Sequence, residues 1–409
     1  MRTVDTATLA SALEALPTNP RVVVSGNHSV PWPLVHLMDA TLERYTLNLL
    51  NAPAGVPDRE GVTLETCFVG VGQRRSPRLR YVPSRLSMVP VLFREQLPVD
   101  AVLLHCTPPR GGHVSLGVEV NVLPAAIEAC RRRGGLVVAL LNDRMPFTHG
   151  DALVPVDEVD LGLEVSEPLP SPGAQAPLGE DARDIGERVA AMVPDGATLQ
   201  MGIGGVPDAV LAALGSHGGL RLWTEMFSDG VLALRASGSL DEDHPLTTSF
   251  VFGSEELYAW LDGNPRVRMT RTERTNDPGL IAQQRMMTSI NTALEVDLFG
   301  QANASRINAR IHSGFGGQTD FIVGALHAPG GQAFIALRSW HPRADVSTIV
   351  PMVDEPVTSF QATAIVTEQG VAPLFGRDEK EQARGLIEGA AHPRVRSELW
   401  EEARALGLT

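Results

Sequence analysis

The chain has 409 residues, which at roughly 100 to 200 residues per domain predicts two or three domains, each able to bury its own core. Its 34 Lys and Arg residues against 48 Asp and Glu residues give a formal net charge of -14, which argues against a nucleic-acid partner or an anionic membrane surface. With 43% hydrophobic residues and no apolar run near the about 20 residues of a membrane helix, the composition indicates a soluble globular protein.

The N-terminal residues and the cysteines bear on the cellular compartment. The start, MRTVDTATLASALEAL, is polar at alternate positions and lacks the charged-then-apolar layout of a signal peptide. The three cysteines, Cys67, Cys106 and Cys130, are odd in number and widely spaced, which favours reduced thiols used in packing over a disulfide framework. We therefore expect a cytoplasmic protein.

The alternation of strand-like and helix-like segments predicts the fold class. Apolar runs typical of strands occur at residues 21–24, 100–104, 135–141 and 197–201, and amphipathic patterns typical of helices occur at 123–133 and 181–192. Strands that alternate with helices predict α/β domains with mainly parallel sheets.

A proline-rich break divides the chain into two halves. The segment 167–177, EPLPSPGAQAP, disfavours helix and sheet and favours an extended linker, so it predicts an N-terminal domain over residues 1–166 and a C-terminal domain over 178–409. The strings RVVVSGNHSVPWPLVHLM and ATLQMGIGGVPDAVLAAL both have the pattern of strand, glycine turn and helix, with Gly26 and Gly202 in the same register. This match suggests two tandem copies of one fold.

Several catalytic motifs are absent from the sequence, and their absence narrows the chemistry. It contains no G-x-S-x-G elbow, no H-E-x-x-H, no C-x-x-C and no Walker A motif. The eleven histidines are scattered, so no metal site is predicted. The only lysine, Lys380, lies in the charged run RDEKEQAR, and a helical, solvated run suits neither a Schiff-base lysine nor a P-loop lysine.

Three glycine-containing clusters follow strand-like segments in the second half. Gly202 to Val206 precede Pro207 at a predicted helix start, where exposed amides attract phosphate or an oxyanion, although a plain tight turn explains them equally well. Gly314 to Gln318 would let the backbone approach a ligand closely, although a β-bulge would also explain them. Glu225 follows the apolar stretch 220–223, where open α/β sheets bind ligands, although an N-cap or salt bridge is the simpler interpretation of this glutamate taken alone.

Taken in order, the motifs resemble the acetyl-CoA hydrolase/transferase branch of the family I CoA-transferases, to which 4-hydroxybutyrate CoA-transferases belong. In the first half the resemblance rests on HVSLG, from His113, and NDRMPFTHGD, from Asn142. In the second half it rests on GIGGVPDAV, TEMFSDGV, TTSFVFGSEELYAWLDGNP, NTALEVDLFGQAN and SGFGGQTDF. It covers nearly the whole chain.

The resemblance implies two tandem CoA-transferase-type α/β domains, with coenzyme A, as the acyl-CoA substrate, held mainly by the second and the acyl site between them. It also implies a homo-oligomer. Glu225 matches the family's catalytic glutamate, and Asn276 matches a residue that orients it. The implied CoA positions are Gly202, Ile203, Gly204, Gly205, Val206, Asn291 and Gly314, and Gly316, Gly317 and Gln318 continue the loop near the thioester.

Two stretches depart from the family pattern. Relatives follow the second glycine loop with an Ile-Ala-Leu-Pro-Ser string, whereas this chain has IALRSW from Ile335, so Arg338 replaces a proline and adds a charge where pantetheine or the acyl group would fit. A glycine- and alanine-rich turn of the relatives is here GNHSVPW from Gly26. We therefore expect the wall that faces the carboxylate, and with it the preferred acid, to differ.

The chemistry of glutamate is consistent with CoA transfer. An exposed glutamate has a pKa of about 4.3, so Glu225 would be ionised at pH 7 without a general base. Its attack on an acyl-CoA thioester would give a mixed anhydride and then a glutamyl-CoA thioester, which a second carboxylic acid resolves in a ping-pong sequence. The alternatives are an acyl-CoA hydrolase on the same fold and, with less support, a non-catalytic CoA-binding protein. The sequence leaves the acyl group and the acceptor acid open.

Overall fold

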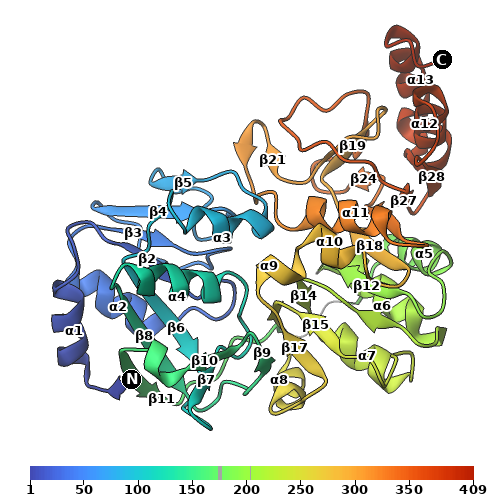
Figure 1. Cartoon of the computed structure of the whole chain (residues 1–409). Coiled ribbons are helices and arrows are strands. Elements are labelled where there is room, and N and C mark those ends of the chain that lie inside the picture. The colour runs from blue at the N-terminus through green and yellow to red at the C-terminus, as the bar shows by residue number, and fades with distance from the viewer. Residues whose placement is uncertain (174–176, 203) are drawn as a thin grey trace. The chain divides into compact units, whose positions relative to one another are not determined.

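The structure is a computed structural model that describes residues 1–173, 177–202 and 204–409 (Figure 1). Contacts within the chain group it into two compact units, which we call unit 1 and unit 2. Unit 1 comprises Met1–Gly173, Thr247–Thr275 and Ile311–Gly316, and unit 2 comprises Ala174–Leu246, Asn276–Arg310 and Gly317–Thr409.

The described part of unit 1 is built on one large sheet. Its helices are α1 (Thr6–Glu14), α2 (Trp32–Thr41), α3 (Val89–Leu92), α4 (Leu123–Arg132), α8 (Glu255–Leu261) and α9 (Thr272–Thr275). Its strands are β1 (Arg2–Thr3), β2 (Arg21–Val24), β3 (Tyr45–Asn48), β4 (Val62–Thr66), β5 (Leu79–Tyr81), β6 (Ala101–Cys106), β7 (His113–Ser115), β8 (Leu136–Asn142), β9 (His149–Gly150), β10 (Leu153–Pro155), β11 (Leu161–Val165), β16 (Phe250–Val251) and β17 (Val267–Met269), with β15 (Leu246–Thr248) at the unit boundary. The main sheet has eight strands in the order β1-β11-β8-β6-β2-β3-β4-β5, and all of its neighbouring strands are parallel.

Helices cover both faces of this sheet, as the alternation of side chains along a strand requires. Val22 and Val24 of β2 belong to a buried cluster that includes Leu9 of α1 and Leu34 of α2, so these two helices cover one face. Val23 is also buried but lies outside that cluster, and α4 packs against β6 and β8. The second face is therefore covered by α4.

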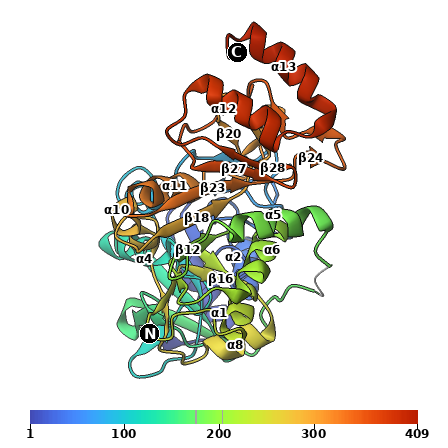
Figure 2. The same cartoon turned by 90° about the vertical axis from the view of Figure 1, so that its right-hand side faces the viewer.

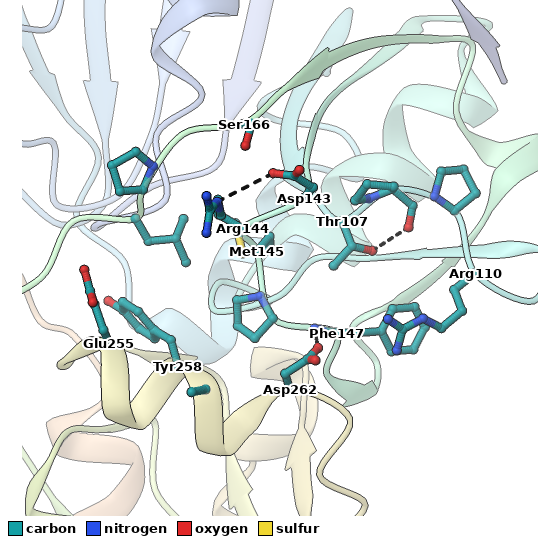
Figure 3. A pocket seen from close by; sticks show the side chains of 16 residues that line it. Thr107, Arg110, Asp143, Arg144, Met145, Phe147, Ser166, Glu255, Tyr258 and Asp262 are labelled. Atoms are coloured by element: carbon teal, nitrogen blue, oxygen red, sulfur yellow. Dashed lines mark hydrogen bonds and ion pairs between the residues drawn. The ribbon is translucent and has the colours of Figure 1, made fainter.

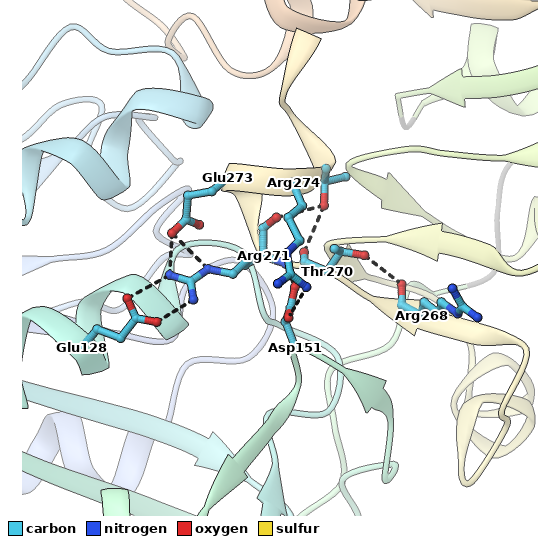
Figure 4. Close-up of polar contacts among 8 residues, drawn as sticks. Glu128, Asp151, Arg268, Thr270, Arg271, Glu273 and Arg274 are labelled. Carbon is cyan, nitrogen blue, oxygen red and sulfur yellow. Dashed lines mark hydrogen bonds and ion pairs between the residues drawn. The ribbon is translucent and has the colours of Figure 1, made fainter. Parts of the chain in front are cut away.

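A cluster of ion pairs attaches the segment around α9 to the rest of unit 1 (Figure 4). The Arg271 side chain, 18% exposed, donates to a Glu128 carboxylate oxygen at 2.6 Å and to Glu273 at 2.5 Å. Arg274 donates to Asp151 at 2.9 Å. Glu128 and Asp151 lie 143 and 123 residues before their arginine partners, so these contacts join distant parts of the chain.

The two units differ from the predicted domains at two segments. The first boundary falls between Gly173 and Ala174, inside the predicted linker 167–177. However, Thr247–Thr275 and Ile311–Gly316, which the prediction placed in the C-terminal domain, belong to unit 1. For the first segment the reason is that β17 pairs in parallel with β9, and that Arg271 and Arg274 form the ion pairs just described. Such pairings between distant segments leave no local signal in the sequence.

The described part of unit 2 is built on a second, smaller sheet. Its helices are α5 (Glu180–Ala190), α6 (Gly205–Ala213), α7 (Gly230–Ala236), α10 (Pro278–Ile281), α11 (Gln318–His327), α12 (Glu379–Gly385) and α13 (Arg396–Ala405). Its strands are β12 (Thr198–Met201), β13 (Arg221–Leu222), β14 (Met226–Phe227), β18 (Met287–Asn291), β19 (Glu295–Asp297), β20 (Ala302–Asn303), β21 (Arg306–Ile307), β23 (Gln332–Ala336), β24 (Trp340–His341), β25 (Val346–Ser347), β26 (Ile349–Val350), β27 (Ala364–Thr367) and β28 (Gly370–Pro373), with β22 (Arg310–Ile311) at the unit boundary.

The sheet of unit 2 has six strands in the order β13-β12-β18-β23-β27-β28, parallel except for the last pair. Helices α10 and α11 lie on one side of the sheet, and α5 and α6 lie on the other (Figure 2). Phe321 of α11 and Ile335 of β23 are both buried in the hydrophobic core of the unit. The predicted class, two α/β halves with mainly parallel sheets, is confirmed.

Strong local patterns predicted individual elements correctly. The runs at 21–24 and 197–201 form β2 and β12, and the pattern at 181–192 forms α5. Both β2 and β12 lead through a glycine turn into a helix, α2 and α6, as the tandem match suggested. Lys380 is exposed on α12, within the predicted charged helix.

The three cysteines are free and buried, and burial raises the pKa of the Cys67 thiol to about 12. Throughout the residues that the structure describes, every helix is too short or too polar to cross a membrane. In the same residues, no group of three or more His, Cys, Asp and Glu side chains is arranged to hold a metal ion.

Candidate active site

Glu225 lies at the carboxyl edge of the unit 2 sheet, just beyond the end of β13. The hydroxyl of the preceding residue, Thr224, contacts the Met201 carbonyl at 3.1 Å and the Met226 carbonyl at 2.9 Å. The Met201 amide in turn donates to the Thr224 hydroxyl at 3.3 Å. Since Met201 ends β12, these bonds fix the loop that carries Glu225 to the neighbouring parallel strand.

Asn276 is the hydrogen-bonding partner of Glu225. Its side-chain nitrogen Nδ2 donates to Glu225 Oε2 at 2.7 Å, and the Asn276 side chain is fully buried. The next residue, Asp277, caps α10 by accepting the Leu280 amide at 2.9 Å, which fixes the backbone at this point. The structure therefore brings together two residues that lie 51 positions apart in the chain.

Gly317 completes this group because the site leaves no room for a side chain there. A Cβ atom on residue 317 would lie 2.0 Å from Glu225 Oε2 and 2.2 Å from Asn276 Nδ2. Gly317 is also the N-cap residue of α11, which begins at Gln318. The backbone at the start of α11 thus runs directly beside the Glu225 carboxylate, close enough to contact an atom that reacts with it.

The surroundings of Glu225 change its acidity. Burial raises the pKa of Glu225 to about 7, and the negative charge of Asp320 acts in the same direction, against the hydrogen bond from Asn276. The expectation of a fully ionised glutamate at pH 7 was therefore wrong, because it assumed an exposed side chain. Near neutral pH the carboxylate and the carboxylic acid are both populated.

Asp320 is a residue that the sequence reasoning missed. It lies in the first turn of α11 and is fully buried. Its signal in the sequence is a carboxylate that directly precedes the apolar stretch Phe321 to Val323, two residues after Gln318. Burying a carboxylate with no lysine or arginine near it in the sequence destabilises a fold, so such a residue is a candidate for a functional role. This reasoning could have identified Asp320.

The loop from Gly202 to Val206 leads from β12 into α6, with Pro207 in the first turn as predicted. Gly204 has a φ of +118°, which favours glycine, and a Cβ on Gly204 or Gly205 would meet no atom within 4 Å. Among the residues that the structure describes, no side chain caps α6, so its first amides have no side-chain partner there. Ile203, also predicted to contact CoA, lies outside the described residues.

Asn291 ends β18 on the same edge of the sheet. Its amide nitrogen donates to Gln200 Oε1 at 3.2 Å and to the Ser289 hydroxyl at 2.9 Å. Gln318, the last residue of the predicted loop, donates from its side-chain amide to the Thr292 carbonyl at 3.3 Å. The ends of β12 and β18 and the start of α11 are therefore joined by hydrogen bonds between side chains and backbone.

Gly314 and Gly316 belong to unit 1, whereas Gly317 and Gln318 belong to unit 2. Gly314 forms an antiparallel bridge with Phe68, and a Cβ there would lie 2.6 Å from the Cys67 carbonyl oxygen. Gly316 has a φ of +57°, and its carbonyl accepts the Leu86 amide at 3.0 Å. Contacts within unit 1 thus account for the lack of a side chain at Gly314, and the predicted contact of Gly314 and Gly316 with CoA stays a prediction.

Each unit also contains a separate cavity. In unit 2, a cavity of about 460 Å³ is lined by residues that include Gly205, Val206, Arg338 and Trp340. In unit 1, a cavity of about 770 Å³ is lined by none of the predicted site residues (Figure 3). Its charged side chains are of both signs, namely Arg110, Asp143, Arg144, Glu255 and Asp262.

The chain matches one protein family along most of its length. Residues 62–168 match the acetyl-CoA hydrolase/transferase N-terminal domain, and residues 253–403 match the C-terminal domain of the same family. The 4-hydroxybutyrate coenzyme A transferase of Clostridium kluyveri is 35% identical, over 97% of this chain and 96% of that protein.

Solved structures and further relatives agree with this match. The 4-hydroxybutyrate CoA-transferase of Porphyromonas gingivalis superposes with a TM-score of 0.83 at 30% identity, over 99% of this chain and 98% of that chain. RipA from Yersinia pestis superposes with a TM-score of 0.91 at 26% identity, over 100% and 98%. The acetyl-CoA hydrolase of Saccharomyces cerevisiae is 34% identical, but over only 48% of this chain and 38% of the hydrolase.

Proposed function

Because the chain belongs to the acetyl-CoA hydrolase/transferase family, we propose that it transfers CoA from a short-chain acyl-CoA to a carboxylic acid with Glu225 as the nucleophile. The observation that carries this assignment is the group formed by Glu225, Asn276 and Gly317 at the carboxyl edge of the unit 2 sheet. Open α/β sheets bind their ligands at this edge.

The Asn276 hydrogen bond orients the Glu225 carboxylate, because Nδ2 of Asn276 donates to Oε2 of the glutamate. In the proposed reaction, a carboxylate oxygen of Glu225 adds to the thioester carbonyl carbon. The carbon–sulfur bond then breaks, which gives an acyl-glutamyl anhydride and the CoA thiolate. The thiolate attacks the glutamyl carbonyl, which releases the acyl group as its carboxylate and leaves CoA on Glu225 as a thioester.

The second half of the reaction is the reverse of the first with a different acid. The acceptor carboxylate attacks the glutamyl-CoA thioester, and the returning thiolate takes the new acyl group from the anhydride. Each addition forms an oxyanion that needs preorganised donors, worth roughly 3 kcal/mol each. We propose that the amides at the start of α6, which no described side chain caps, and the backbone at Gly317 supply them. In this proposal, CoA is held mainly by residues 178–409, with Asn291 beside the bound substrate.

Transfer is favoured over hydrolysis by the relatives. The 4-hydroxybutyrate coenzyme A transferase matches over 97% of this chain, whereas the acetyl-CoA hydrolase of Saccharomyces cerevisiae matches over 48%. A non-catalytic CoA-binding role is disfavoured by the hydrogen-bonded Glu225, because a protein that only binds CoA has no need of a carboxylate with a raised pKa beside a side-chain-free position.

The fate of the enzyme-bound CoA tests this proposal. With acetyl-CoA alone, a transferase releases acetate only in proportion to the enzyme and retains a thioester, which mass spectrometry would find on a peptide that contains Glu225. Adding propionate as acceptor should restart turnover, with parallel double-reciprocal lines. Continuous release of free CoA without acceptor, at a rate comparable to transfer, would assign the protein as a hydrolase instead.

We further propose a cytoplasmic, homo-oligomeric enzyme that needs no metal. The three buried free thiols are consistent with a reducing compartment, and the homo-oligomer follows the family resemblance. Light scattering on the purified protein measures the oligomeric state, and activity that survives dialysis against a chelator would support metal-independent catalysis.

A further inference from the structure

The cavity of unit 2 lies at the carboxyl ends of three neighbouring parallel strands. Gly205 and Val206 follow β12, Thr292 follows β18 and Arg338 follows β23, and all four line the cavity. Since β12, β18 and β23 are adjacent in the sheet, the cavity continues the edge on which Glu225 lies. Two of its lining residues, Arg338 and Arg343, carry positive charge.

The backbone at Arg338 is held by two neighbours. The hydroxyl of Thr348 donates to the Arg338 carbonyl at 2.5 Å, and the amide of Ser339 donates to a Glu368 carboxylate oxygen at 2.9 Å. By contrast, among the described residues the one carboxylate paired with the Arg338 guanidinium is Asp181, at the long distance of 3.8 Å, and the Arg338 side chain is 39% exposed. An exposed pair of this length contributes little, so a stronger anion could replace Asp181.

Arg343 lies in the turn between β24 and β25 and is exposed. The turn is fixed from within, because Trp340 Nε1 donates to Asp345 at 3.0 Å and the Ala344 amide donates to His341 Nδ1 at 3.0 Å. Within the described ranges, no carboxylate pairs with Arg343. Two arginines with weak or no counter-charge thus line one cavity, although the chain as a whole has a net charge of -14.

The distance from β13 to β23 along the edge of the sheet matches the length of the pantetheine arm of CoA. Glu225 follows β13, and β23 is three strands away in the sheet, which at about 4.8 Å per strand is about 14 Å. The pantetheine arm from the sulfur to the first phosphate has about as many bonds as four extended residues, which span about 14 Å. A thioester at Glu225 would therefore place the phosphates of CoA near Arg338.

We propose that Arg338 and Arg343 bind the phosphate groups of CoA. This inference rests on the proposed function, since it requires the thioester to react at Glu225. Guanidinium groups suit this role because their planar donors match phosphate oxygens and remain charged at all physiological pH values. Arg338, which replaces a proline in the string that the sequence resembles, would in this proposal recognise the phosphate end of CoA.

A comparison of two substrates isolates the phosphate contacts. The variants are Arg338→Gln, Arg343→Gln and the double variant, and Arg377→Gln is the matched control because Arg377 is an exposed unit 2 arginine outside the cavity. The substrates are acetyl-CoA and S-acetylpantetheine, which lacks the diphosphate and the 3′-phosphate. We expect the ratio of kcat/KM for acetyl-CoA to that for S-acetylpantetheine to fall about tenfold per arginine and to stay at the wild-type value in the control.

A binding measurement separates this inference from the proposed function. Adenosine 3′,5′-diphosphate carries CoA phosphates without the thiol arm, and its titration into wild-type protein by calorimetry needs no catalysis. Loss of this binding in the double variant, with circular dichroism unchanged, would support the phosphate site. If the enzyme also turned over no acyl-CoA, that second result would reject only the proposed reaction. An active enzyme whose substrate ratio is the same in the double variant and the control would overturn the phosphate site and leave the reaction standing.

Discussion

Oε2 of Glu225 lies 2.7 Å from the side-chain nitrogen of Asn276, so a residue 51 positions further along the chain holds the carboxylate in place. Because Asn276 is a neutral amide, its hydrogen bond orients the glutamate without transferring a proton to it and without placing a charge beside it. The remaining oxygen of the buried Asn276 side chain has no partner among the residues that the structure describes. This arrangement leads to four predictions.

Glu225→Gln should abolish transfer and keep the fold. The amide has nearly the same shape but cannot form an anhydride, so we expect the rate of CoA transfer to fall at least about 1,000-fold. Steady-state kinetics and circular dichroism measure the two effects. Glu187→Gln is the matched control, since Glu187 is exposed on α5. Activity of the Glu225 variant within about tenfold of wild type would exclude this glutamate as the nucleophile.

The pH dependence of kcat/KM should follow the ionisation of Glu225. Because the carboxylate is the nucleophile and the pKa of Glu225 is about 7, kcat/KM should increase with pH through neutrality and level off above it. Asp320→Asn removes a negative charge that raises this pKa, so the rise should occur at lower pH in that variant. A profile that is flat between pH 5 and 8, or one that moves to higher pH in the variant, would contradict the assignment.

The same ionisation predicts how stability varies with pH. A carboxyl group whose pKa rises on folding, here from 4.5 to about 7, binds more protons in the folded than in the unfolded state across that interval, so the free energy of unfolding falls as pH increases through it. Glu225→Gln removes this ionisation and with it the pH-dependent loss of stability. The free energy of unfolding of the variant, relative to wild type, should therefore be higher at pH 8 than at pH 4 by on the order of 3 kcal/mol. Urea unfolding at both pH values tests this, and an equal stability difference at the two would count against a raised pKa for Glu225.

Gly317→Ala should damage the site more than Gly204→Ala. A Cβ on residue 317 would overlap Glu225 and Asn276, so we expect a large loss of kcat and a destabilisation of about 1 to 3 kcal/mol. At Gly204 the space is open but φ is +118°, so backbone strain should raise the KM for acyl-CoA with a smaller effect on kcat. Kinetics and thermal unfolding compare the two variants. Equal effects on kcat would mean that Gly317 is only a turn residue.

Sequence motifs identified most residues of the candidate site but not how they are arranged in space. The strings GIGGVPDAV and TEMFSDGV predicted a glycine turn before a helix and a glutamate after a strand, and the structure has α6 after Gly204 and Glu225 after β13. For Gly314 the sequence favoured a ligand contact, and in the structure a Cβ atom there would also lie 2.6 Å from the Cys67 carbonyl oxygen. A glycine requirement in the sequence does not distinguish a ligand from a neighbouring backbone, because both exclude a Cβ atom.

By itself, the sequence determined the fold class, the strand–turn–helix units and the family, because these depend on local patterns of apolar residues and glycines. Only the tertiary structure decided the acidity of Glu225 and the assignment of Thr247–Thr275 to unit 1. The partners that set that acidity, Asn276 and Asp320, come from other elements far along the chain. Burial and the electric field at a carboxylate are sums over such distant neighbours, so they exist only once the chain has folded.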